Sequence, residues 1–143
     1  MTYDLGILGG GQLARMSIQA AQRMGLRCLS LDPGSDTPAS QIAHAVQGQL
    51  SDPKAIAQVA EQCRRLTLEN EFIPADSIRQ GLALSGRAED CIVPGIDTLA
   101  IIQDKLLQRQ TLQNSLVPSP FARAFTSETW TQPVVLKTRF GGY

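Results

Sequence analysis

Three glycines near the start of the chain are the first residues that could bind a ligand. Gly9, Gly10 and Gly11 open the sequence GGGQLA, which fits G-x-G-x-x-A between an apolar segment and a helical pattern. Such glycines let the backbone turn tightly and let a ligand approach it, and the following helix offers unpaired N–H groups. Asp32 follows about 20 residues later, where a dinucleotide-binding fold holds a ribose hydroxyl. The loop alone leaves open a nicotinamide or flavin site, a site for another nucleotide-like ligand, or simple packing.

Lys137 is the second candidate for ligand chemistry. It directly follows the apolar run 134–136 and is followed within three residues by the glycine loop FGGY (140–143). Lysine is rarely buried without a partner, so a charge placed after such a run indicates a specific role. His44, the only histidine, has no comparable context, and we expect it to be solvated or satisfied rather than catalytic.

The elements that must position these residues alternate along the chain. Asp52 and Pro53 predict a helix start through capping and the first-position preference of proline. Gly25 fits the position just past a helix end. The patterns predict strands at 3–8, 27–32, 46–50, 66–72 and 91–94, helices at 12–24, 53–63 and 74–84, and a short helix or turn at 39–46. Such alternation is typical of a parallel sheet with helices on both faces, so the fold class is α/β and Rossmann-like over residues 1–95.

The residues after about 95 differ in character. The pattern over 97–114 predicts one helix, which Pro118 and Pro120 end. Two further strands are predicted at 121–125 and 134–139. We interpret 96–118 as a linker helix and 119–143 as the first strands of a second, truncated domain.

The composition excludes several classes of function. The 13 basic and 13 acidic residues cancel, so the chain lacks the basic surface that nonspecific nucleic-acid binding needs. The pair Arg64–Arg65 is expected on a solvated surface or strand edge. No apolar run approaches the roughly 20 residues of a membrane span, and the start lacks a signal peptide's basic region. Cys28, Cys63 and Cys91 form no zinc or disulfide motif, so we expect buried thiols and a cytoplasmic location.

Five segments, in one order along the chain, resemble a known family. They are GILGGGQLARM (6–16), LDPGSDTPASQIA (31–43), TLENEFIP (67–74), QDKLLQRQTL (103–112) and VVLKTRFGGY (134–143). The set resembles the amino-terminal part of the 5-(carboxyamino)imidazole ribonucleotide synthase family, within the ATP-grasp superfamily. The resemblance implies a complete pre-ATP-grasp domain, followed by the beginning of an ATP-binding domain.

The resemblance implies an ATP-dependent carboxylation in purine (IMP) biosynthesis. Bicarbonate is expected to be phosphorylated to carboxyphosphate, and the amine of 5-aminoimidazole ribonucleotide to take up the carboxylate. The family holds Mg²⁺ with carboxylates of its later domain, so no metal ligand is expected in this chain. Family members are usually homodimers, so a homodimer is expected, and the isolated chain is expected to be inactive.

The resemblance also implies roles for single residues. Gln12 and Leu13 are expected to contact the ribonucleotide from the first helical turn. Glu69 is expected to hold the substrate at the carboxyl end of a strand, where open α/β sheets bind ligands, and Glu71 could share or take this role. Asp32 is expected to support its own loop rather than a dinucleotide.

The ATP-binding residues implied by the resemblance lie in the second half. Lys105 on the linker helix and Lys137 on a strand are expected to reach the phosphates. Gly141, Gly142 and Tyr143 are expected to begin the loop that covers them.

Three alternatives stay open at this point. A formate-dependent glycinamide ribonucleotide transformylase-like enzyme is disfavoured by the segments ENEFIP and TRFGGY. A nicotinamide-binding module would leave TRFGGY and Lys137 unexplained. A non-catalytic fragment that only binds or dimerises is the third.

Overall fold

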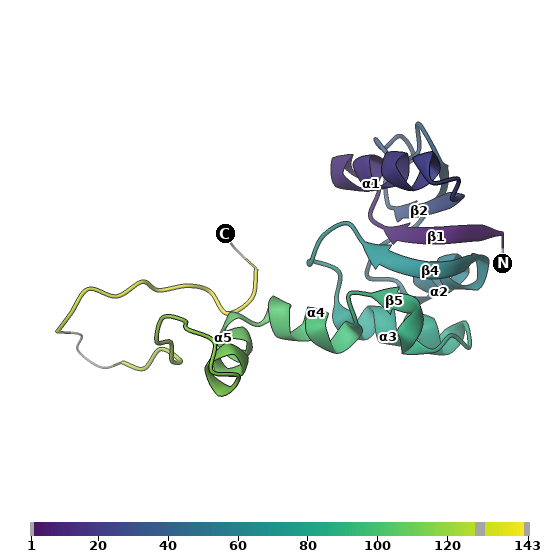
Figure 1. The fold of residues 1–143 in the computed structure, drawn as a ribbon. Helices are drawn as coiled ribbons and strands as arrows, with labels where there is room; N and C mark the ends of the chain where they lie inside the picture. Colours follow the sequence, from purple (N-terminus) through teal and green to yellow (C-terminus); the bar gives the residue numbers. More distant parts are fainter. Residues whose placement is uncertain (1, 128–130, 142–143) are drawn as a thin grey trace.

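The computed structural model describes residues 2–127 and 131–141 of the chain. Within them, five parallel strands form a sheet in the order β3-β2-β1-β4-β5, with β1 at its centre (Figure 1). The strands are β1 (Tyr3–Leu8), β2 (Cys28–Asp32), β3 (His44–Gln47), β4 (Cys63–Leu68) and β5 (Ile92–Val93). The predicted α/β class with a parallel sheet is confirmed.

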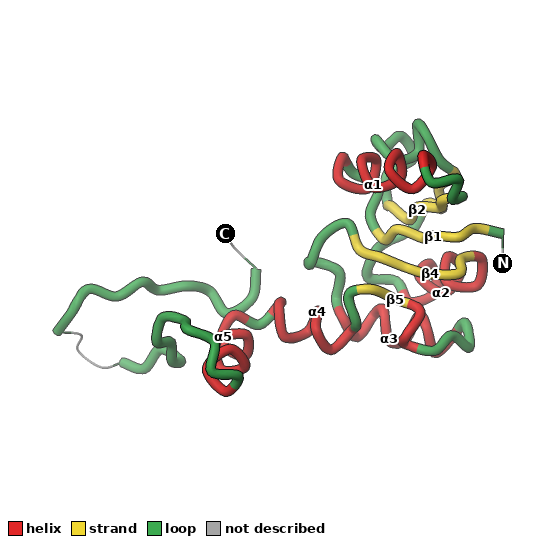
Figure 2. Tube along the Cα trace, viewed as in Figure 1, coloured by secondary structure: helices red, strands yellow, loops and turns green. Residues whose placement is uncertain are grey.

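Helices connect the strands, except for the turn between β2 and β3, and continue beyond the sheet (Figure 2). They are α1 (Gln12–Arg23), α2 (Pro53–Gln62), α3 (Ala75–Leu84), α4 (Ile96–Gln103) and α5 (Lys105–Asn114), with a short 3₁₀ helix, η1 (Glu89–Cys91), before β5. Two predicted local signals are confirmed. The Asp52 carboxylate accepts a hydrogen bond from the Lys54 N–H at 2.9 Å, directly before Pro53 begins α2 as its first residue. Gly25 has a φ of 78° just past α1, a conformation that favours glycine.

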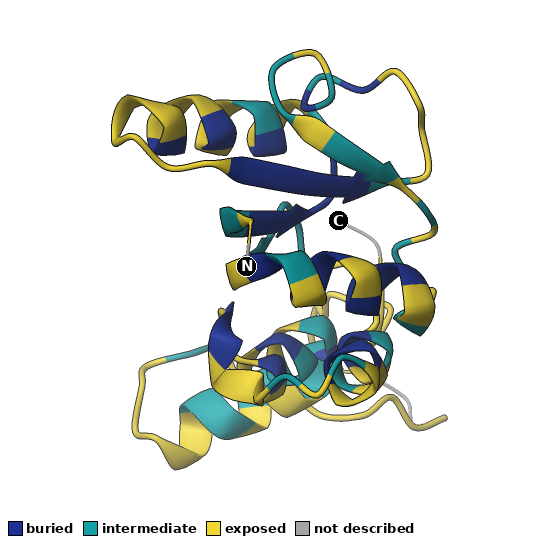
Figure 3. Cartoon of the chain, turned by 90° about the vertical axis from the view of Figure 1, so that its right-hand side faces the viewer, coloured by how far each residue is buried: buried dark blue, intermediate teal, exposed yellow. Residues whose placement is uncertain are grey.

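Helices cover both faces of the sheet. Leu8 lies in one core with Ile56 of α2 and Ile78 of α3, whereas its neighbour Ile7 lies in the other core with Ile18 of α1. This division follows because successive side chains of a strand point to opposite faces. Buried residues accordingly occupy the strands and the helix sides that face them (Figure 3).

The third strand differs from its prediction. It spans His44–Gln47 rather than 46–50, and the turn before it covers residues 38–42. The cause is pairing with β2, whose residues Leu29–Asp32 align with His44–Gln47 in parallel register. The short helix or turn expected at 39–46 is therefore a turn, and it ends earlier than expected.

The fourth strand also differs from its prediction. It spans Cys63–Leu68 rather than 66–72. Its partner β1 sets these limits, because the parallel register runs from Tyr3 opposite Cys63 to Leu8 opposite Leu68. Residues 69–72 therefore form the turn that leaves the carboxyl edge of the sheet.

The segment predicted as one helix over 97–114 is two helices. α4 ends at Gln103, α5 begins at Lys105, and Asp104 between them is extended, with φ −101° and ψ 100°. The Asp104 carboxylate accepts hydrogen bonds from the Leu106 and Leu107 N–H groups, a capping geometry that requires a non-helical backbone at the cap residue.

The strands predicted at 121–125 and 134–139 are wrong. Neither segment is a strand, and neither pairs with another segment in a ladder within the described residues. A strand needs a neighbour to satisfy its N–H and C=O groups, and these residues instead lie in the extended segment beyond α5 (Figures 1 and 2). The domain division at residues 95 and 118 stays a prediction.

Candidate functional site

The carboxyl edge of the sheet gathers the glycine loop and two acidic residues. The loop of Gly9 to Gly11 follows β1, Asp32 ends β2, and Glu69 follows β4. Since β2 and β4 flank β1, Asp32 lies on one side of the loop and Glu69 on the other. The chain crosses from β3 at one edge of the sheet to β4, so the strand order reverses between β1 and β4, the switch point where open α/β sheets bind ligands.

Glu69 binds the first turn of α1. Its Oε2 accepts a hydrogen bond from the Gly11 N–H at 2.9 Å, and its Oε1 accepts a longer one from the Ala14 N–H at 3.4 Å. α1 has no side-chain cap of its own, so this distant carboxylate takes the place of one at the positive end of the helix. Gly9 and Gly11 are needed for this approach, because a Cβ at either would lie 2.5 Å or less from Glu69 atoms.

Asp32 binds two loops at once. Its Oδ2 accepts a hydrogen bond from the Gly10 N–H at 2.9 Å, and its Oδ1 accepts one from the Gly34 N–H at 2.8 Å. The prediction that Asp32 supports its loop is confirmed, and the glycine loop after β1 is held by it as well. Both oxygens are engaged with backbone amides of the protein.

Gln12 and Leu13 lie at the start of α1, beside these carboxylates. The Leu13 side chain is 59% exposed, although the helical face next to it is buried. No acceptor within the described residues is found for the N–H groups of Gln12 and Leu13. The two predicted substrate-contacting residues thus present free amide donors at the carboxyl edge of the sheet.

Glu71 lies in the turn after β4, apart from the glycine loop's hydrogen bonds. Its carbonyl accepts a hydrogen bond from the Gln103 Nε2 at 2.7 Å, and the same amide group donates to the Ile73 carbonyl at 2.6 Å. Gln103 therefore ties the end of α4 to this turn. Of the two acids, Glu69 is the one that the structure joins to the first turn of α1.

A second group of predicted residues meets at the start of α5. The Lys105 N–H donates to the Arg139 carbonyl at 3.0 Å, and the Lys105 ammonium donates to the Gly141 carbonyl. Thr138 Oγ1 donates to the same carbonyl at 3.1 Å. The exposed Lys137 directly precedes this docked segment. Gly142 and Tyr143 lie outside the described residues.

Asp104 and Arg139 hold this second group together, and neither is among the residues predicted from the sequence to bind a ligand. Arg139 Nε and Nη2 donate to Asp104 Oδ1 and Oδ2 at 2.8 and 2.5 Å, a two-pronged ion pair. This pairing, helped by the N–H groups of Leu106 and Leu107, lowers the pKa of the Asp104 carboxyl to about 2. An aspartate followed by a helical pattern is a cap signal, and it was available at Asp104.

The two groups lie on the same side of the sheet. α4 leaves the sheet domain, with Ile96 and Leu99 still buried in its core, and leads to α5 and the segment docked on it (Figure 1). α4 therefore lies between the two groups of candidate residues along the chain.

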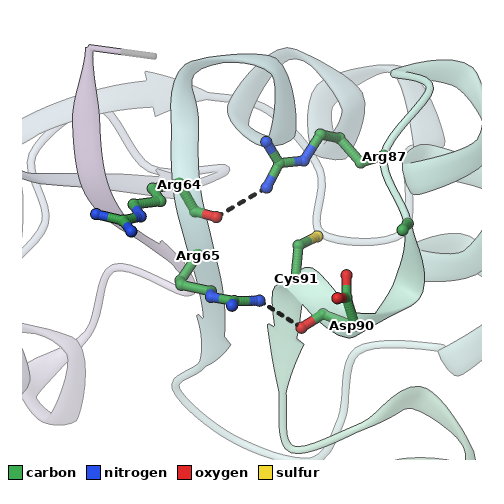
Figure 4. A pocket seen from close by; sticks show the side chains of 6 residues that line it. Arg64, Arg65, Arg87, Asp90 and Cys91 are labelled. Atoms are coloured by element: carbon green, nitrogen blue, oxygen red, sulfur yellow. Dashed lines mark hydrogen bonds between the residues drawn. The ribbon is translucent and has the colours of Figure 1, made fainter.

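The arginine pair lies at the opposite, amino end of β4. Arg64 and Arg65 line a hollow of about 260 Å³ with Arg87 and Asp90 (Figure 4). Arg65 Nη1 donates to the Asp90 carbonyl at 2.7 Å, and Arg87 Nη2 donates to the Arg64 carbonyl at 2.8 Å. Both of these arginine side chains thus bond backbone carbonyls, and the predicted surface position of Arg64 and Arg65 is confirmed.

Further observations bear on metals, thiols and membranes. Cys28, Cys63 and Cys91 are buried and unpaired, as predicted, and burial raises the pKa of the Cys63 thiol to about 12. Across residues 2–127 and 131–141, no group of three or more His, Cys, Asp or Glu side chains is placed to hold a metal ion. The same residues contain no helix of the length and apolarity that crossing a bilayer requires.

Comparison with known proteins identifies the family. A sequence model of the ribonucleotide synthetase preATP-grasp domain matches residues 1–103. The chain belongs to the ribonucleotide synthetase preATP-grasp family. The preATP-grasp match covers all five strands and ends at Gln103, the last residue of α4.

Several relatives of this preATP-grasp chain are named as N5-carboxyaminoimidazole ribonucleotide synthases or synthetases. The N5-carboxyaminoimidazole ribonucleotide synthase of Staphylococcus aureus (strain COL) is 35% identical over 149 residues, covering 97% of this chain and 38% of that protein. The crystal structure of N5-carboxyaminoimidazole ribonucleotide synthetase from Thermotoga maritima matches with a TM-score of 0.75 and 32% identity, over 83% of this chain and 32% of that one. These matches confirm the resemblance on which the sequence analysis relied.

A third relative was solved with ligands. The N5-carboxyaminoimidazole synthase of Aspergillus clavatus, in complex with ADP and 5-aminoimidazole ribonucleotide, matches with a TM-score of 0.71 and 31% identity. The match covers 82% of this chain and 30% of that one. The preATP-grasp chain therefore spans less than two fifths of the length of each of these relatives.

Proposed function

We propose that this chain is the amino-terminal part of an enzyme that carboxylates 5-aminoimidazole ribonucleotide in purine (IMP) biosynthesis. ATP and bicarbonate are the other substrates, and the product is 5-(carboxyamino)imidazole ribonucleotide. The family and the names of the relatives support this proposal. The observation that carries it is the position of the Glu69 carboxylate over the first turn of α1.

Glu69 at this position suits a sugar rather than a phosphate. A carboxylate offers about four lone-pair positions, and the hydrogen bonds to the amides of Gly11 and Ala14 use two of them. The others can accept hydroxyl protons, as a ribose ring provides. A phosphate at the same place would meet a like charge, although the helix end would otherwise attract it. We therefore place the ribose of the ribonucleotide at Glu69, beside the free amides of Gln12 and Leu13.

The same geometry argues against a dinucleotide. In a dinucleotide-binding domain the pyrophosphate lies at the amino end of the first helix, and an acid at the end of the second strand holds a ribose hydroxyl. Here the Glu69 carboxylate occupies the helix end, where it would face the pyrophosphate as a like charge. The nicotinamide-binding alternative thus lacks its pyrophosphate position.

The residues at the start of α5 suit the phosphates of ATP. The Lys105 ammonium contacts residues 138–141 through the Gly141 carbonyl, and Lys137 directly precedes these residues. Positive donors of this kind stabilise phosphoryl transfer. Bound Mg²⁺ supplies further positive charge to the transferring phosphoryl group. The described residues hold no carboxylate cluster that fits it, so we assign its ligands to the later domain of the family.

We further propose a cytoplasmic homodimer as the setting. Three buried, unpaired cysteines suit a reducing compartment. The dimer rests on the family resemblance, and sedimentation equilibrium of the purified protein measures it directly.

A ligand titration tests the proposed substrate. We expect 5-aminoimidazole ribonucleotide, added up to millimolar concentration to the ¹⁵N-labelled chain, to shift the amide signals of Gly11, Gln12 and Leu13. Glu69→Gln should weaken this response, because an amide carbonyl is a poorer acceptor than a carboxylate. Glu61→Gln is the matched control, since Glu61 is exposed on α2.

Two outcomes would contradict the proposal. One is a saturating response that leaves these three amides unmoved or that is equally strong in Glu69→Gln. The other is saturable binding of NAD at micromolar concentration, with shifts at Gly10 and Asp32, which would restore the nicotinamide alternative.

A further inference from the structure

Among the residues that the structure describes, Asp104 is the one charged residue that is buried. Only 8% of its side chain is exposed, whereas its partner Arg139 is 57% exposed. Both carboxylate oxygens face the Arg139 guanidinium, at 2.8 and 2.5 Å. Such a fork is directional, because the planar guanidinium matches a carboxylate in only a few orientations. The pair therefore fixes how residue 139 lies against the break between α4 and α5.

Three backbone and side-chain contacts depend on that orientation. The Arg139 carbonyl accepts the Lys105 N–H, and the Gly141 carbonyl accepts both the Lys105 ammonium and the Thr138 hydroxyl. The Arg139 guanidinium also lies over the Phe140 ring, 5.5 Å from its centre. Together these contacts dock residues 138–141 on the first turn of α5.

We propose that Asp104 and Arg139 are positioning residues for the ATP site. Their ion pair holds residues 138–141 on α5 and thereby sets where the Lys105 ammonium lies. This inference rests on the proposed function for the phosphate role of Lys105 and Gly141. It explains why the helix predicted as continuous breaks at Asp104, since a helical Asp104 would lose the capping and pairing geometry.

The alternative is that Asp104 only caps α5. Its Oδ1 accepts the N–H groups of Leu106 and Leu107 at 3.1 and 3.2 Å, which is the usual work of a cap residue. A cap alone would not need Arg139, and it would leave residues 138–141 undocked. The two explanations therefore differ in what Arg139 does to Lys105.

The Lys105 amide reports on the docked segment specifically. It is the first N–H of α5, and such a group has no acceptor within its own helix. Its acceptor is the Arg139 carbonyl, at 3.0 Å. Slow hydrogen exchange at this amide therefore measures the docking of the segment, and ¹⁵N spectra of the chain without nucleotide resolve it.

We expect Arg139→Met to speed exchange of the Lys105 amide about tenfold or more, the scale of losing a charge-assisted hydrogen bond. Arg139→Lys keeps the positive charge without the two-pronged hydrogen bonding. Its exchange rate at the Lys105 amide should lie between those of the wild type and Arg139→Met. Asp104→Ser keeps a capping oxygen but loses the ion pair with Arg139, so it should also speed exchange of the Lys105 amide. The Gln108 amide, which donates to the carbonyl of residue 104 at 2.8 Å, should stay protected. Arg109→Met is the control: it changes a different arginine, which lies on α5 itself, and it should leave the exchange of the Lys105 amide unchanged.

Two results would overturn the inference. The first is wild-type exchange of Lys105 in Arg139→Met, which would leave capping as the role of Asp104. The second is a loss of protection throughout the sheet, including the Glu69 amide bonded to the Leu8 carbonyl, which would show a general structural role. Because no nucleotide is present, failure of the ribonucleotide titration would not alter either result.

Discussion

The bond between Glu69 and the glycine loop gives the sharpest test of the site's architecture. Glu69→Ala removes the acceptor of the Gly11 N–H at 2.9 Å and of the Ala14 N–H at 3.4 Å. Glu69 is only half-buried, so water can reach the released amides, and the loss is that of a helix cap rather than of a buried ion pair. A cap is worth about 1 kcal/mol, and the favourable charge at a helix amino end adds about 0.3–1 kcal/mol.

We therefore expect Glu69→Ala to lower the free energy of unfolding by about 1–2 kcal/mol. At roughly 4 °C per kcal/mol for a chain of this size, the melting temperature should fall by about 4–8 °C. Glu69→Gln keeps one carbonyl acceptor and should lose about half as much. Glu61→Ala, an exposed acid on α2, is the control and should change stability by less than about 0.5 kcal/mol.

Urea unfolding followed by far-ultraviolet circular dichroism measures these values. Dichroism is preferable to fluorescence, because the single tryptophan, Trp130, lies outside the described residues. An unfolding free energy of Glu69→Ala equal to that of the wild type would refute the reasoning. It would mean that the carboxylate lies near the loop without bonding to it in solution.

Three further predictions address other parts of the chain. The pKa of Asp104 is lowered from 3.8 to about 2, so its ionised form stabilises the folded state above pH 3.8, and this contribution is lost as pH falls through about 2. Urea midpoints between pH 4 and pH 2 should therefore fall less steeply in Asp104→Asn, and parallel slopes would contradict this. Gly81→Ala should destabilise the chain by about 1–3 kcal/mol despite alanine's higher helix propensity, because the new Cβ would lie 2.7 Å from Ile56 Cβ on α2. Gly95→Ala should destabilise the chain less, because no atom lies within 4 Å of a Cβ built at Gly95. A larger fall in melting temperature for Gly95→Ala than for Gly81→Ala would count against the packing argument. The purified 143-residue chain should show no bicarbonate-dependent ATP hydrolysis with 5-aminoimidazole ribonucleotide, and turnover in a coupled ADP assay would show that these residues suffice.

Local sequence signals determined most of the sheet domain. The alternation of apolar strands and amphipathic helices predicted the α/β class, because the spacing of apolar residues within each element indicates which of its sides is buried. Asp52–Pro53 and Gly25 marked helix ends correctly, because a cap depends on residues only a few positions apart. The family resemblance added Glu69, Lys105 and the glycine segment as candidates, which composition and spacing alone did not separate from ordinary surface residues.

Tertiary contacts decided the rest. β3 and β4 begin and end where their partner strands, β2 and β1, pair with them. The local sequence of β3 and β4 does not indicate these limits. Two strands expected after α5 did not form, because an apolar run becomes a strand only beside a neighbour that completes its hydrogen bonds. Asp104 and Arg139 are 35 residues apart, and only the folded chain brings them into one ion pair that divides the expected helix. Glu69 likewise reaches the glycine loop across 58 residues, because parallel strands bring their carboxyl ends to one edge of the sheet.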